Sequence, residues 1–141
     1  MNKQFYFAAI GGAIASFLLG WVVYGILLMD FYKTNTTVYE GLMKDPPVLW
    51  AIFLAGLCST TLLAWIFSKM GITSFMKGVT TALWIGFLLT AWYNLSSHAF
   101  MNLYTTKLMI GDLVISSLFT AVIGGIVAWI LGMGNKSVTT A

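Results

Sequence analysis

Four long stretches of this chain contain no Asp, Glu, Lys or Arg, and each is long enough to cross a membrane. They run approximately from Phe5 to Met29, from Val48 to Ser68, from Gly78 to Met101 and from Leu113 to Met133. A transmembrane helix needs about 20 mostly apolar residues to cross about 30 Å of hydrocarbon. We therefore predict an all-α integral membrane protein, in which residues 1–141 form a single four-span domain folded as a four-helix bundle.

The composition excludes several classes of function. Apolar residues make up 60% of the chain and charged residues only 8%, whereas soluble domains carry about 25% charged residues. The basic residues are scattered lysines that form no stripe, so no nucleic-acid partner is expected. Because the chain has one histidine and one cysteine, an all-protein cluster of His and Cys ligands cannot form. We expect no metal and no cofactor.

Lysines between the spans predict the orientation, because lysine-rich loops tend to stay in the cytoplasm. With the N-terminus inside, the inner side collects Lys3, Lys69, Lys77 and Lys136; the outer side collects Lys33, Lys44 and Lys107, together with Asp30, Glu40, Asp45 and Asp112. We predict that both termini are cytoplasmic and that loops 30–47 and 102–112 face outside. Tryptophans should mark the interfaces, except Trp21 and Trp92, which we expect to pack within the bundle.

Small residues recur at four-residue spacing in every span, as in helices that approach one another closely. The residues expected to pack helices together in this way are Gly12, Ser16, Gly20, Gly86 and Gly124.

Two similar segments, MDFYKT from residue 29 and MNLYTT from residue 101, follow the first and third spans. These spans run in the same direction, so both segments should lie at the same depth on the outer side. At the start of the fourth span, Asp112 is a plausible N-cap. Residues four apart on a helix are neighbours, as Asn94, His98 and Asn102 would be at the end of the third span. We therefore expect an outer polar cluster, usable for ligand binding, of Tyr24, Asp30, Asn94, His98, Asn102 and Tyr104.

His98 has two interpretations. An ionisable group inside a span is a candidate functional site, but His98 can equally mark the point where the third helix emerges into the headgroups. Copper binding by His98 with Met29 or Met101 is chemically possible, yet methionines in an apolar chain more often fill space. No catalytic triad spacing, phosphate-binding loop or paired carboxylates within a span is present, so we expect no enzymatic activity.

The chain resembles a bacterial family of small four-span membrane proteins, domain-of-unknown-function family 1761. The resemblance covers Gly11 to Gly132 and rests on GWVVYG at Gly20–Gly25, on Gly78 and Gly86, and on IGGIVAWILG at Ile123–Gly132. In that family the first span typically ends with adjacent Trp and Tyr followed by Pro, whereas here Trp21 and Tyr24 are separated and no proline follows. The resemblance implies a four-span fold and no established chemistry.

These observations predict a non-enzymatic protein of the bacterial inner membrane that acts by binding. Its expected partners are membrane lipid and either a second copy or the other subunits of a membrane complex, in which it serves as subunit or accessory. The alternative is a small transporter or channel for a small molecule or ion, using the outer polar cluster around His98.

Overall fold

The computed structural model describes residues 3–134, which are almost entirely helical. The elements are α1 (Lys3–Val22), a π-helical turn (Val23–Leu27), α2 (Met29–Asn35), α3 (Leu49–Met70), α4 (Phe75–Phe100) and α5 (Thr106–Met133). Four helices are long and apolar enough to cross a membrane, counting α1 together with the π-helical turn. The predicted all-α membrane bundle is therefore confirmed. Lys136, used above to predict the orientation, lies outside the described residues.

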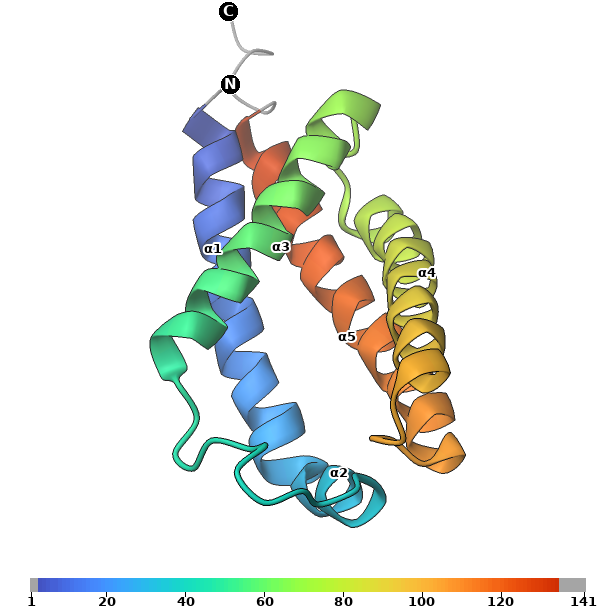
Figure 1. Cartoon of the computed structure of the whole chain (residues 1–141). Coiled ribbons are helices and arrows are strands. Elements are labelled where there is room, and N and C mark those ends of the chain that lie inside the picture. Colours follow the sequence, from blue (N-terminus) through green and yellow to red (C-terminus); the bar gives the residue numbers. More distant parts are fainter. Residues whose placement is uncertain (1–2, 135–141) are drawn as a thin grey trace, which may run out of the picture.

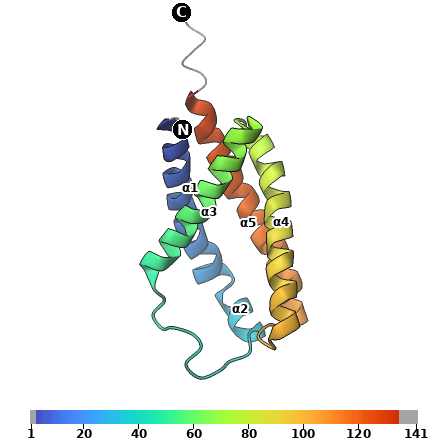
Figure 2. The ribbon, with the colours of Figure 1, turned by 45° about the horizontal axis from the view of Figure 1, so that its top comes forward.

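Helix α5 occupies the middle of the bundle (Figures 1 and 2). It packs along α4 on one side and along α1 on the other, while α3 crosses α1 and also touches α5. Although α3 and α4 are consecutive in the chain, they make almost no contact with each other. The first residue of α1 and the last of α5 lie at the same end, which we call the Lys3 end; the opposite end, where α2 lies, is the α2 end (Figure 1).

The α4–α5 interface is a seam of small residues in which the two backbones approach closely. A β-carbon added to Gly86 would lie 2.6 Å from Cβ of Thr120, and one added to Gly78 would lie 2.6 Å from the carbonyl oxygen of Gly124. A β-carbon on Gly124 would collide with that of Ala82. Only residues without large side chains fit here, which places the small-residue rows of the third and fourth spans face to face.

Helices α1, α3 and α5 meet around Gly12. A β-carbon there would lie 2.7 Å from Val127 and 3.0 Å from Thr60. The fully buried Thr60 hydroxyl donates a hydrogen bond of 2.8 Å to the carbonyl oxygen of Ala9 and so joins α3 to α1. Further along α1, Ser16 faces Gly56 of α3, and Gly20 has ordinary contact with Phe119.

The apolar core lies toward the Lys3 end. Its members are Phe5, Ala8, Leu63, Ala64, Phe67, Ile72, Ala82, Ile123, Val127, Ala128 and Leu131. They come from the first half of α1, the second half of α3, the first third of α4 and the second half of α5, with Ile72 in the connection between α3 and α4. The α2 end is consequently held by other interactions, described below.

The fourth span starts earlier than the sequence indicated. Helix α5 begins at Thr106, and the Thr105 hydroxyl caps it by accepting a hydrogen bond from the backbone N–H of Leu108 at 3.2 Å. The predicted N-cap role of Asp112 is therefore wrong. Because Thr105 already caps the helix, Asp112 falls inside it, within the candidate span.

The placement of two tryptophans also corrects a prediction. Trp21 and Trp92, expected within the bundle, are 65% and 68% exposed. Both rings lie on the outer surface of the bundle, which lipid covers in a membrane protein.

Replacing Gly124 by Ala tests the seam. The added methyl meets Ala82 and the backbone of α4, so we expect unfolding to become easier by about 1–3 kcal/mol, the usual cost of overpacking. The matched control is Gly20→Ala, whose methyl finds ordinary contact distance to Phe119 and should be neutral or slightly stabilising. The free energy of unfolding of both variants is measured by the loss of helical circular dichroism as SDS is added to dodecyl maltoside micelles. Equal destabilisation of the two variants would contradict the seam.

Candidate functional site

The carboxylate of Asp112 accepts three hydrogen bonds from three directions. The Tyr32 hydroxyl donates to Oδ1 at 2.6 Å, and the Ser116 hydroxyl donates to the same oxygen at 2.9 Å. The Asn94 amide donates to Oδ2 at 3.1 Å and to the carbonyl oxygen of Met109 at 3.2 Å. Because the single Ser116 proton goes to Asp112, the hydroxyl of Tyr24, 3.2 Å from Ser116 Oγ, is the donor in that pair. We call these five residues, Tyr24, Tyr32, Asn94, Asp112 and Ser116, the Asp112 network.

The position of Asp112 along α5 explains why it needs these donors. Helix α5 has 28 residues and is therefore about 42 Å long, which exceeds the hydrocarbon thickness of about 30 Å. If α5 is centred and upright, about 6 Å of it projects at each end, and Asp112 lies about 9 Å from its start. With this placement the carboxylate would sit just inside the hydrocarbon boundary, where an unpaired charge is costly.

Each donor comes from a different part of the fold. Tyr32 belongs to α2, Asn94 to α4, Ser116 to the next turn of α5, and Tyr24 to the π-helical turn. That turn is marked by the hydrogen bond of 2.9 Å from the Leu28 N–H to the carbonyl oxygen of Val23, five residues back. Such turns often occur at functional sites. Here the turn precedes α2 and brings the Tyr24 and Tyr32 rings edge to face, with centroids 5.5 Å apart.

Backbone pairing also fixes α2 against the start of α5. The Thr37 N–H donates to the carbonyl oxygen of Leu103 at 2.8 Å, and the Thr105 N–H donates to that of Asn35 at 3.1 Å. The Phe31 ring lies against Gly111, where a β-carbon would be 2.6 Å from it. The two similar segments, MDFYKT and MNLYTT, are thus neighbours, and each contributes its tyrosine to one site.

A cavity of about 670 Å³ opens at the α2 end. Its lining includes four tyrosines, three charged residues, one asparagine and two apolar residues of α5: Tyr32, Tyr39, Tyr93, Tyr104, Lys33, Glu40, Asp112, Asn94, Leu108 and Met109. Three of these, Tyr32, Asn94 and Asp112, belong to the Asp112 network. Asn94 is buried and Asp112 is partly buried. The cavity therefore combines mainly aromatic and aliphatic walls with one anchored carboxylate.

Two phenols of this cavity, those of Tyr32 and Tyr104, have raised pKa values. Burial and the hydrogen bond to Asp112 raise the pKa of Tyr32 well above its ordinary value. Burial, with the adjacent Tyr93 hydroxyl and the more distant charge of Asp112, raises the pKa of Tyr104 to about 12. These two phenols therefore add no negative charge to the cavity at neutral pH.

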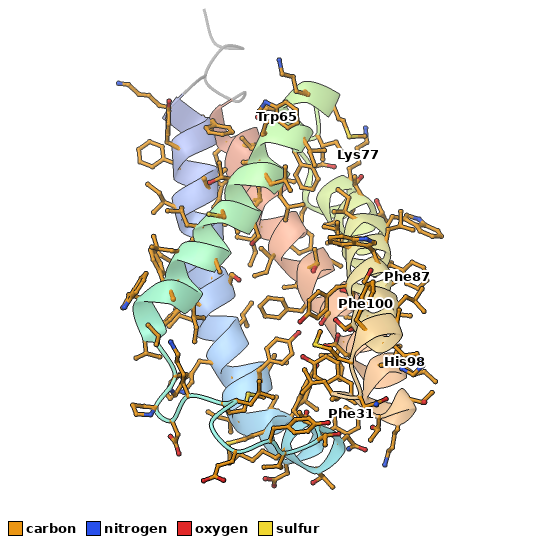
Figure 3. All side chains as sticks on the ribbon, viewed as in Figure 1. Phe31, Trp65, Lys77, Phe87, His98 and Phe100 are labelled. Atoms are coloured by element: carbon orange, nitrogen blue, oxygen red, sulfur yellow. The ribbon has the colours of Figure 1, made fainter. Side chains whose placement is uncertain are left out.

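The structure brings together only some of the six residues expected in a polar cluster. Tyr24 and Asn94 belong to the Asp112 network, and Tyr104 lines the cavity. Asp30, His98 and Asn102 have exposed side chains. Figure 3 shows His98 on the outer side of α4, pointing away from the bundle.

Sequence reasoning missed Asp112, the residue at the centre of the site. It treated Asp112 as a helix cap, and so regarded the spans as free of acidic residues. The available signal was Thr105, a good capping residue followed by the apolar Leu108–Ile110. A helix starting at Thr105 would have placed Asp112 one turn before Ser116 and inside the membrane.

The arrangement is suited to recognition. The oxygens of a carboxylate offer about four acceptor positions, and the network occupies three of them. Within residues 3–134 no three or more His, Cys, Asp or Glu side chains come together as a metal site would require. What remains available is one acceptor position on a fixed negative charge.

No protein-family model matches the chain, and no curated protein or solved structure matches it either. The resemblance to family 1761 therefore stays a prediction, and the function has to be argued from the site.

Replacing Tyr32 by Phe tests whether Asp112 holds α2 in place. Losing a hydrogen bond to a charged group costs about 1.5–3 kcal/mol, so the Thr37 and Thr105 amides should exchange with deuterium about tenfold faster or more. Tyr39→Phe is the control, since its exposed hydroxyl makes only a 3.5 Å contact with the carbonyl oxygen of Asn102. If amide exchange is unchanged in Tyr32→Phe, or is accelerated equally in Tyr32→Phe and Tyr39→Phe, the role of Tyr32 is contradicted.

Proposed function

We propose that this chain is a non-enzymatic integral membrane protein that binds a small amphiphilic molecule in the cavity at the α2 end. The observation that carries the proposal is a cavity of about 670 Å³ with a hydrogen-bonded carboxylate in its wall. Ligand pockets typically measure about 300–1,000 Å³ and combine apolar walls with a few placed polar groups.

The lining favours a ligand with one polar and one apolar part. Asp112 and Asn94 provide polar contacts on one side of the cavity, while Leu108 and Met109 provide apolar surface on the same helix. The cavity is at the level where the hydrocarbon meets the headgroups, as the position of Asp112 on α5 indicates. Molecules with both characters concentrate at that level.

Binding accounts for the geometry better than transport does. A transport path would have to continue from the cavity toward the Lys3 end. Along that direction α4 and α5 are in contact, first at Gly86 and Thr120 and then at Gly78 and Gly124. His98, the centre of the transport alternative, lies on the outer side of α4, away from the cavity (Figure 3).

The orientation and setting of the site belong to the same proposal. We propose that the protein lies in the inner membrane of a bacterium, with the Lys3 end in the cytoplasm and the α2 end outside; the distribution of the scattered lysines supports this orientation. The exposed apolar surfaces of α3 and α4 would contact lipid, a second copy or another membrane subunit, for which the chain would act as an accessory.

A bulky residue in the cavity should abolish binding. In Met109→Trp the indole fills space that the ligand would occupy, whereas in Ile110→Trp the same indole replaces a side chain that is 62% exposed on the next position of α5. We expect a small amphiphile, at about one molecule per chain, to co-purify with the wild type and with Ile110→Trp. The amount of co-purified amphiphile per chain should fall about tenfold or more in Met109→Trp.

Mass spectrometry of small molecules extracted from equal amounts of folded protein in dodecyl maltoside makes this measurement. Equal amounts of amphiphile in the two tryptophan variants would contradict binding in this cavity. The absence of a stoichiometric small molecule from the wild type and both variants would also contradict it.

A further inference from the structure

We infer that the ligand of the α2-end cavity carries an ammonium group, which sits against Asp112 and among the tyrosine rings. This inference rests on the proposed function and adds the chemical class of the ligand.

The first argument is the charge balance of the cavity. The three groups that donate to Asp112 are a phenol, a carboxamide and an alcohol, all neutral. The network therefore orients the carboxylate without neutralising it. Two other charged residues line the cavity, Lys33 and Glu40, and their charges offset each other. With Asp112 included, the lining carries a net charge of −1, which a monovalent cation would balance.

The second argument is the acceptor position that the network leaves. Tyr32 and Ser116 both donate to Oδ1, while Asn94 alone donates to Oδ2. A carboxylate oxygen accommodates about two hydrogen bonds, so Oδ2 can accept one more. An ammonium group has only donors to offer and fits that position, whereas a carboxylate or phosphate ligand would meet like charge.

The third argument is the aromatic composition of the walls. Four of the six tyrosines of the chain line this cavity: Tyr32, Tyr39, Tyr93 and Tyr104. Aromatic faces attract cations through the ring quadrupole, and more strongly when the cation is removed from water. The raised pKa values of Tyr32 and Tyr104 keep these two rings neutral, so both would contact an ammonium group as aromatic surfaces.

Three probes with the same alkyl chain and different heads test the inference: octylammonium, 1-octanol and octanoate. They are titrated into the full chain in dodecyl maltoside micelles, which contain no ammonium group, and saturable binding is measured by calorimetry. We expect octylammonium to bind at least about tenfold more tightly than octanol, and a tenfold difference in affinity corresponds to about 1.4 kcal/mol. Octanoate should bind most weakly. Equal affinities for octylammonium and octanol would overturn the inference.

Matched variants locate the effect. Asp112→Asn keeps the shape of the side chain and should lower octylammonium affinity about tenfold or more, while octanol binding stays unchanged. Asp30→Asn changes the net charge by the same amount at an exposed residue that does not line the cavity, and should have no effect. Loss of octylammonium affinity in Asp30→Asn as large as in Asp112→Asn would show a general charge effect and would overturn the inference.

Tyr93→Leu gives a second route that leaves the Asp112 network intact, in case Asp112→Asn does not fold. Removing the ring should weaken the binding of octylammonium several times more than the binding of octanol. An equal effect on both probes would show that the ring provides only apolar surface, and the aromatic part of the inference would fall.

The outcomes separate the two proposals. If none of the three probes binds saturably, the proposed function fails; if all bind equally, the cavity binds amphiphiles without reading their charge, and only the further inference fails. A final arm identifies the source of the ammonium group. Short-chain phosphatidylethanolamine competing with octylammonium, where phosphatidylglycerol does not, would indicate a lipid headgroup; competition by neither would indicate a free amine.

Discussion

A carboxylate within a helix long and apolar enough to cross a membrane must find hydrogen-bond donors, and the α2 end of this protein is arranged around that requirement. Asp112 obtains its donors from α2, α4 and its own helix. Each donor restrains the position of the element that carries it, so α2, α4 and α5 are joined at one carboxylate in addition to their packing contacts. The polar group is costly to bury, and for that reason it specifies the arrangement of its neighbours strongly.

The two ends of the bundle are therefore stabilised by different interactions. Toward the Lys3 end, alanines and glycines allow the backbones to approach, and dispersion between closely packed helices supplies the stability. Toward the α2 end, hydrogen bonds replace close packing and leave room for a cavity. The same helix α5 serves both ends, with Gly124 and Ala128 in the seam and Asp112 and Ser116 in the network.

The sequence predicted the fold well and the site incompletely, for physical reasons. Apolar runs and four-residue spacing are local, so the four spans and the glycines of the α4–α5 seam could be read directly. Tyr24, Asn94 and Tyr104 were expected in one polar cluster, and in the structure they lie in the Asp112 network or in the cavity lining. Their partner was missed, because whether Asp112 caps a helix or lies within it depends on where that helix begins. The exposure of His98 depends on the rotation of α4 against α5, which no local pattern specifies.

The π-helical turn at Val23–Leu27 has a consequence for the length of the chain. Successive residues of an α-helix are rotated by about 100°, so one residue more or fewer before α2 would turn Tyr32 toward a different side. The turn provides the rotational phase that lets Tyr24 and Tyr32 approach the same region of α5. Insertions and deletions between these two tyrosines would leave hydropathy almost unchanged and yet separate the rings. The spacing of Tyr24 and Tyr32 is therefore as much a signature of this site as the residues themselves.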